Sequence, residues 1–320
     1  MSSDDRPLHA RWAADTTNGL DLSGQGVDIV ADPGRRDLEA LDLDRNRLTA
    51  LPPWVAQQLD LRFLSVYANT LATLPPELAR LTRLEVLNIS ANALVDLGAS
   101  LDGLRHLRMV DAGHNRLTAL PAALGANTRL AYLYAADNRL EVLPEALVGL
   151  GALRYLNLAE NRFAALPAWL GSLAGLVELR ASDNRLDALP DGIGELAFLR
   201  ELHVANNRLS VLPESLGRLA RLRVLGLTGN ALTSLPADIG GLTALVELNL
   251  RFNRLTTLPE TIGDLGALRR LDLRANALTE LPDALGALPV LERLDLRWNP
   301  LRRVPDWVAG LEARGCVVWL

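Results

Sequence analysis

Histidine and cysteine, which bind metal ions and act in nucleophilic catalysis, are few in this sequence. Its histidines are His9, His106, His114 and His203, and its one cysteine is Cys316. The histidines fall in different phases of the repeating pattern described below, with no carboxylate or cysteine at ligand spacing. The sequence therefore predicts no metal site.

Two other features suggest chemistry only on first inspection. Cys316 lies beside apolar residues near the C-terminus, without a nearby histidine in sequence, so a place in a terminal core is expected. The run Gly192-Ile-Gly194-Glu-Leu-Ala197 has the form of a dinucleotide fingerprint, but it follows Pro190 and lacks the strand, loop and helix context. We expect no catalytic residue and no cofactor.

Asparagine recurs at twelve positions that are 23 residues apart. These are Asn46, Asn69, Asn92, Asn115, Asn138, Asn161, Asn184, Asn207, Asn230, Asn253, Asn276 and Asn299. A strict period of this length indicates units that stack into a solenoid. Because a buried amide donates and accepts at once, a column of asparagines can satisfy the backbone groups of successive sharp turns. We predict a structural ladder.

Leucines surround each asparagine at fixed spacing. One unit reads Leu222, Leu225, Leu227, Asn230, Leu232, Leu235, Pro236, Ile239 and Leu242. Because side chains alternate across a strand, Leu225 and Leu227 would face the core, while Val224 and Gly226 would face the other way. Parallel strands of successive units would then pair into one sheet.

Proline follows the second loop leucine in eleven of the twelve units, and Gly98 is the exception. Proline fixes φ and has no N–H, which suits an extended return path or a short 3₁₀ turn better than a long helix. The side opposite the sheet is therefore expected to consist of short turns.

The pattern L-x-x-L-x-L-x-x-N-x-L-x-x-L-P-x-x-L resembles the L-x-x-L-P subclass of leucine-rich repeat proteins, which are intracellular scaffolds of the Ras-group and related bacterial types, over roughly residues 20–320. The resemblance implies an α/β repeat fold, a right-handed leucine-rich repeat solenoid (horseshoe). A parallel concave β-sheet would line one side, and short 3₁₀ or extended segments would form the convex side.

Both ends of the chain depart from the repeat. We expect a loosely ordered segment over residues 1–18 and a degenerate capping repeat over 19–37, with Gln25 in the ladder position. The array of twelve units would cover 38–304, its last unit running into a C-terminal cap over 305–320. That cap reads as a short helix followed by an apolar strand, since solenoids need atypical terminal units to close the core.

Composition limits location and partners. The chain has no signal-peptide pattern, no run of 18 apolar residues and a single cysteine, so we expect a cytoplasmic protein without a membrane partner. All 33 basic residues are arginine and the net charge is −5, which argues against nucleic acid as a partner. The lack of lysine suggests a GC-rich, bacterial coding sequence.

Aromatic residues and one methionine cluster at strand positions that face away from the core in the second to sixth units. These candidates for partner binding are Phe63, Tyr67, Met109, Tyr132, Tyr134 and Tyr155. Tyrosine combines a large apolar area with a polar tip, so it is enriched at binding hot spots. The alternative is that these side chains only stack on their neighbours across the sheet.

From the seventh repeat onward the equivalent positions are charged. The further binding candidates are Arg180, His203, Arg251, Arg274 and Arg297. The last three share one phase and would form a column of like charges, with Asp272 and Asp295 two residues before two of them. Two alternatives remain: an internal arginine–carboxylate lattice, or a seat for an acidic segment of a partner.

The sequence thus predicts a monomeric, non-catalytic scaffold that binds a protein or peptide through its concave face. One alternative is an effector that acts on host proteins inside another organism's cells, for which a lack of lysine would remove ubiquitin acceptors. Another is the targeting subunit of an enzyme complex. The effector would share the expected surface and differ only in delivery, whereas a targeting subunit would have a catalytic neighbour in the same operon or complex.

Overall fold

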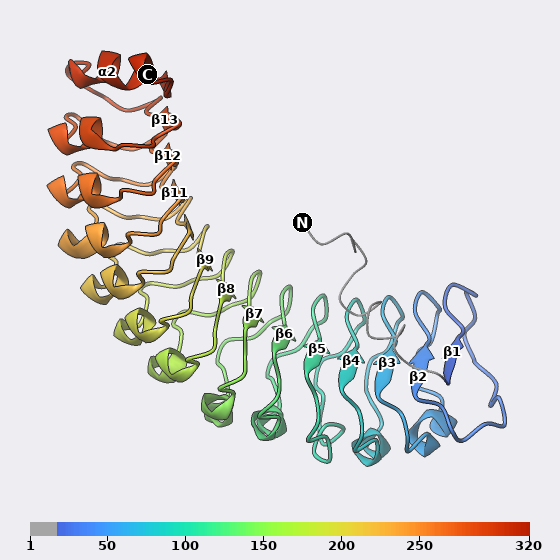
Figure 1. Ribbon diagram of the computed structural model, residues 1–320. Coiled ribbons are helices and arrows are strands. Elements are labelled where there is room, and N and C mark those ends of the chain that lie inside the picture. Colours follow the sequence, from blue (N-terminus) through green and yellow to red (C-terminus); the bar gives the residue numbers. More distant parts are fainter. Residues whose placement is uncertain (1–17) are drawn as a thin grey trace. The chain divides into compact units, whose positions relative to one another are not determined.

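The computed structural model describes residues 18–320. Its contacts divide the chain into two compact units, one ending at Asn157 and the other beginning at Leu158. In each unit, three-residue strands line one side and short 3₁₀ turns line the other (Figure 1). The loosely ordered segment expected over residues 1–18 lies, apart from Asn18, outside the described residues.

The first unit contains seven strands and four 3₁₀ turns in the described residues. The strands are β1 (Gly19–Asp21), β2 (Ala40–Asp42), β3 (Phe63–Ser65), β4 (Val86–Asn88), β5 (Met109–Asp111), β6 (Tyr132–Tyr134) and β7 (Tyr155–Asn157). The turns are η1 (Pro53–Gln57), η2 (Pro76–Arg80), η3 (Ala122–Ala126) and η4 (Glu145–Gly149). Neighbouring strands pair in parallel and in chain order.

The second unit repeats this plan and ends in a helix and a last strand. Its strands are β8 (Glu178–Arg180), β9 (Glu201–His203), β10 (Val224–Gly226), β11 (Glu247–Asn249), β12 (Arg270–Asp272), β13 (Arg293–Asp295) and β14 (Val317–Trp319). Its turns are η5 (Ala168–Ser172), η6 (Asp191–Glu195), η7 (Glu214–Arg218), η8 (Ala237–Gly241), η9 (Glu260–Asp264) and η10 (Asp283–Ala287), followed by α2 (Trp307–Ala313).

The leucine pattern sets the strand register. Leu225 pairs with Leu202 on one side and Leu248 on the other, so leucines stack on leucines from repeat to repeat. All three are fully buried, whereas Val224 and Gly226 beside them are partly exposed. The expected alternation is therefore present, and the parallel sheet with short 3₁₀ turns confirms the predicted fold class.

Proline starts the 3₁₀ turns. Pro75 has φ −71° and ψ 140°, and its carbonyl accepts a hydrogen bond of 3.0 Å from the N–H of Leu78. In the repeat without proline, Gly98 has a positive φ of 49°, and no 3₁₀ helix forms between β4 and β5 in the described residues. The single sequence exception thus coincides with a different return path.

The glycines of the apparent dinucleotide fingerprint serve packing instead. Gly194 lies in η6, where a Cβ atom would stand 2.2 Å from the carbonyl oxygen of Ser215 in η7. Since no Cβ tolerates such a contact, glycine permits successive turns to approach closely.

The two ends are closed by unlike elements. β1 pairs with β2 in register, but Gln25, at the ladder position, is exposed and makes no ladder hydrogen bond within residues 18–320. At the other end β14 pairs with β13, and Cys316 is buried. Across residues 18–320, no helix has the length and apolar character needed to cross a bilayer.

Candidate binding surface

The ladder asparagines bond their own turn to the turn before it. The Asn69 amide donates to the carbonyls of Val66, 3.1 Å away in its own repeat, and of Leu43, 3.0 Å away in the preceding one. Its Oδ1 accepts the N–H of Leu48 at 3.0 Å. The same bonds recur in the second unit, for example around Asn253, whose amide donates to Leu227 and Leu250. These side chains satisfy backbone groups of two successive turns.

The open face of each unit is the side of the sheet that carries the strand side chains pointing away from the leucine core. In the first unit, the first residues of successive strands form one row across this face. The row includes Ala40, Phe63, Val86 and Met109, which form a buried cluster. Phe63 is 3% exposed and Met109 is 2% exposed. The prediction that these two residues present contact area to a partner is therefore wrong, because their row is a second apolar core.

The tyrosines lie at the end of this row and keep part of their surface exposed. Tyr132 and Tyr134 of β6 pack against the buried cluster, and the rings of Tyr134 and Tyr155 lie 4.7 Å apart with an interplanar angle of 36°. Tyr67 is also partly exposed, and its backbone N–H donates to Asp44 Oδ1 at 2.7 Å. The structure thus brings together three tyrosines from two neighbouring strands.

Two carboxylates lie near the start of this face. Burial raises the pKa of Asp42 to about 6, and the neighbouring charges of Asp44 and Asp21 act in the same direction. Burial also raises the pKa of Asp44, whose carboxylate accepts hydrogen bonds from Ser65 and Tyr67. Asp42 has no arginine partner among the described residues.

The open face of the second unit starts with a group of acidic, basic and imidazole side chains. Ligand atoms of Glu178, Glu201 and His203 lie within 4.8 Å of one another. Both carboxylates already have partners, since Arg180 Nε donates to Glu178 at 2.5 Å and His203 Nε2 lies 3.0 Å from Glu201. The grouping was missed in the sequence because Glu178 comes from another repeat and is brought to His203 by the register of β8 and β9.

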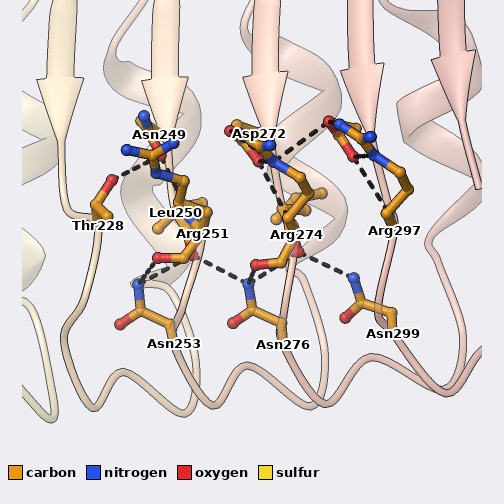
Figure 2. A network of polar contacts seen from close by, with 12 residues as sticks. Thr228, Asn249, Leu250, Arg251, Asn253, Asp272, Arg274, Asn276, Arg297 and Asn299 are labelled. Carbon is orange, nitrogen blue, oxygen red and sulfur yellow. Dashed lines mark hydrogen bonds and ion pairs between the residues drawn. The ribbon is translucent and has the colours of Figure 1, made fainter.

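The arginine column extends across β11 to β13 (Figure 2). Arg274 pairs with Asp272 at 2.6 Å and with Asp295 at 3.3 Å, and Arg297 pairs with Asp295 at 2.6 Å. Hydrogen bonds to these carboxylates raise the pKa of both arginines. An internal lattice therefore compensates two members of the column.

Arg251, the third member, differs from the other two. Its Nε atom is buried and has no hydrogen-bond partner in the part of the chain that the structure describes. The residue two positions earlier is Asn249, whose amide oxygen accepts the hydroxyl of Thr228 at 2.8 Å (Figure 2). The neutral amide takes the place of the carboxylates that pair with Arg274 and Arg297, so Arg251 has no counter-ion within residues 18–320.

A pocket of about 290 Å³ lies over this part of the sheet. Leu248 and Leu271 contribute to its lining, as do Arg270, Arg293 and Trp319. Arg270 is paired with Glu247, whereas Arg293 has no ion pair in the described part of the chain. The pocket therefore combines apolar surface with an uncompensated guanidinium group.

Two exposed aromatic residues at the edge of this region were missed in the sequence. Phe252 and Trp298 are 52% and 66% exposed, and their rings stack at 6.5 Å. Both have positive φ angles, 56° and 61°, in the position directly before a ladder asparagine. The guanidinium of Arg297 lies over the rings of Trp298 and Trp319, at 5.9 and 5.6 Å. An aromatic residue before the ladder asparagine was the available signal.

Comparison with known proteins supports the same architecture. Residues 211–313 match a family model described as a leucine-rich repeat region, and residues 60–117 and 174–232 match a second model described as a leucine rich repeat. A search of curated proteins gives no significant match.

Solved structures give the closer comparison. The chain is 34% identical to a leucine-rich repeat protein of Leptospira interrogans, with a TM-score of 0.83, over 89% of this chain and 73% of that one. A TDR receptor is 29% identical with a TM-score of 0.75, over 82% of this chain and 47% of that one. A chain of the octameric complex of latrophilin 3, Unc5D and FLRT2 shares the fold at 23% identity and a TM-score of 0.73, over 89% of this chain and 90% of that one. The chain belongs to the leucine-rich repeat family.

Proposed function

We propose that this chain is a non-catalytic interaction scaffold that binds a protein or peptide through the open face of its sheet. The observation that carries the proposal is the group formed by Tyr132, Tyr134 and Tyr155, which are partly exposed at the end of a buried apolar row. The leucine-rich repeat fold typically mediates protein–protein interaction, and one structural neighbour is part of a complex with protein partners.

The packing of the tyrosines suits recognition. Because Tyr132 and Tyr134 rest on the buried row, their rings are held in place before a partner arrives. Binding to ordered side chains loses little conformational entropy, and a tyrosine ring offers apolar area together with a hydroxyl group. A partner would therefore gain contact area without first ordering the site.

The proposal gives the chain no catalytic role. Burial raises the pKa of the Cys316 thiol, which disfavours the reactive thiolate. His203 and Glu201 pair with each other on the open face, and we assign them to the binding surface. A cytoplasmic location, a bacterial source and a monomeric state belong to the same proposal.

The test is affinity capture followed by direct titration. Wild type and the Tyr132→Ala, Tyr134→Ala double variant are used to capture proteins from the source organism, and each retained protein is then purified and titrated. We expect unchanged folding by circular dichroism and binding at least about tenfold weaker in the double variant.

Val142→Ala serves as the matched control, because Val142 lies in the same unit and is 69% exposed. Equal binding by wild type and the double tyrosine variant would exclude the tyrosine group as the interface. Loss in the control as well would attribute the effect to the unit as a whole.

A further inference from the structure

We propose that the open face of β11 to β13 is a seat for an extended acidic peptide segment, bound through Arg251 and Arg293. The inference rests on the proposed function, because it assumes an interaction scaffold, but it concerns the second unit and a different chemistry. It names the class of ligand: a chain segment with two separated carboxylates.

The first argument is the local charge. We count the first and third residues of β11, β12 and β13, and the residue two positions after each strand ends. These positions hold more arginines than carboxylates. The arginines are Arg251, Arg270, Arg274, Arg293 and Arg297, and the carboxylates are Glu247, Asp272 and Asp295. The whole chain has a net charge of −5, so a surplus of positive charge here is a local property of this surface.

The second argument identifies which guanidinium groups are available. Arg274 and Arg297 are held by Asp272 and Asp295, and Arg270 is held by Glu247. These arginines are already compensated and serve mainly to hold the lattice. Within residues 18–320, Arg251 and Arg293 have no ion pair, so they are the groups that a ligand carboxylate would reach.

The third argument is the unsatisfied state of Arg251. A buried polar atom without a hydrogen bond is unfavourable, and more so when the group is charged. Nε of Arg251 is such an atom. Because this atom itself is shielded from solvent, a ligand carboxylate would bind the partly exposed remainder of the guanidinium group and supply the countercharge that Asp272 supplies to Arg274 in the next repeat. The binding site is thus the place where the lattice lacks one carboxylate.

The register sets the spacing of the two carboxylates. Arg293 of β13 is in register with Glu247 of β11, two strands away. Arg251 lies four residues after Glu247 along the chain. With about 4.8 Å between strands and 3.3 Å per residue, the two Cα atoms lie about 16 Å apart. An extended peptide covers that distance in about five residues, so it would cross the sheet diagonally.

The intervening surface selects a peptide rather than a dense polyanion. Asp272 and Asp295 lie between the two free arginines and would repel a phosphate at every step of a nucleic-acid backbone. Neutral residues between two carboxylates avoid this repulsion. Trp319, which lines the pocket and is 37% exposed, offers apolar contact to those neutral residues.

The test uses a fluorescein-labelled ten-residue peptide with two glutamates five positions apart among serine, glycine and alanine. Binding to the full chain is followed by fluorescence anisotropy at low salt, where charge interactions are screened least. We expect saturable binding. A peptide with both glutamates replaced by glutamine should bind about tenfold more weakly or worse.

Two sets of variants test the residues. Arg251→Gln with Arg293→Gln should weaken binding by about tenfold or more. Arg185→Gln with Arg208→Gln is the matched control, because it removes the same charge from two exposed arginines of the same unit that have no ion pair in the described residues. Equal losses in the two double variants would overturn the proposal in favour of unspecific charge attraction.

Asn249→Asp tests the idea in the opposite direction. It supplies the carboxylate that Arg251 lacks and recreates the Asp-x-Arg pattern of the two following repeats. We expect a higher melting temperature together with weaker peptide binding, a combination that damage to the fold does not produce. Unchanged or tighter peptide binding in this variant would contradict the assignment of Arg251.

The remaining outcomes are also decisive. No saturable binding of the glutamate peptide by wild type would overturn the proposal, and so would stronger displacement by a ten-residue oligothymidylate than by unlabelled peptide.

The Tyr132→Ala, Tyr134→Ala protein should bind the peptide as wild type does. If it does, while capture of its partner is lost, the two sites are separate; failure of the peptide alone leaves the tyrosine proposal standing.

Discussion

The open faces of the two units are formed by the same positions of the repeat, but these positions carry different kinds of side chain. In the first unit, the row that contains Phe63 and Met109 is apolar and buried. In the second unit, the same row contains Arg270 and Arg293, which are exposed. Both units have apolar core positions and ladder asparagines at the same phases of the repeat. The repeat therefore determines the core and the turns, while the row on the open face is apolar and buried in one unit and charged and exposed in the other.

The largest expected difference between the units concerns this row. Phe63→Ala should lower the free energy of unfolding by about 3 kcal/mol, because it leaves a cavity at a side chain that is 3% exposed. Arg270→Ala, at the equivalent position, should lower it by less than about 1 kcal/mol, since it removes an exposed ion pair. Denaturant titration of both variants checks the contrast; equal effects would show that burial does not distinguish the two faces.

The next difference concerns the carboxylates Asp42 and Asp295, which share a position in the repeat. Asp42 has a pKa of about 6 in the folded protein, above the ordinary value of 3.8, so the folded state holds more protons between these pH values. Stability from Asp42 is therefore complete below about pH 4 and is lost as the pH rises through about 6. Because the Asp42 side chain is partly exposed, solvent screening makes the loss smaller than the roughly 3 kcal/mol that the full shift would give.

Asp42→Asn removes this titration and should flatten the dependence of the unfolding free energy on pH between about 4 and 7. Asp295 is the contrast, because it forms ion pairs with Arg274 and Arg297. Asp295→Asn should destabilise the protein at neutral pH by leaving those arginines without their carboxylate. If Asp42→Asn leaves the pH profile unchanged, burial is not what raises the pKa of Asp42.

The ladder should show no difference between the units. Asn115→Leu in the first unit and Asn253→Leu in the second should each lower the free energy of unfolding by about 1 to 3 kcal/mol, because each leaves buried backbone groups without partners. Similar melting midpoints for the two variants would confine the contrast between the units to the open face. An unchanged midpoint in either variant would argue against the ladder as a source of stability.

The smallest expected effect is the coupling between Tyr134 and Tyr155. Aromatic pairs at such distances contribute about 0.5 to 1.5 kcal/mol beyond the apolar area that they bury. A double-mutant cycle with Tyr134→Leu and Tyr155→Leu measures this coupling directly. A coupling energy of zero would mean that the rings adjoin without stabilising each other, and that the tyrosine group is held only by the buried row.

Periodic features were predictable from the sequence. The phases of Asn230 and of Leu225 recur in every unit, so strand, core and turn follow from alternation and hydrogen-bonding needs alone. Gly98, the one departure from proline, marks the repeat that has no 3₁₀ turn in the described residues.

The open face was predictable only in part, because its state depends on contacts between repeats. Exposure was expected for Phe63 and Met109, yet neighbouring side chains in their row bury them. The pairing of Arg274 with Asp295 of the next repeat required the strand register. The difference between Asn249 and Asp272 was visible in the sequence, but its meaning depended on the unpaired Nε of Arg251.

The asparagine ladder also has a mechanical consequence. Each amide links only its own turn to the one before, as Asn276 does through Leu273 and Leu250, so no bond of the ladder extends further. A pulling force on one end of a unit therefore loads one rung at a time instead of sharing the load among all rungs. We expect rupture to travel inward as a peeling front that releases about 80 Å of chain per repeat, a length that follows from 23 residues at about 3.5 Å each.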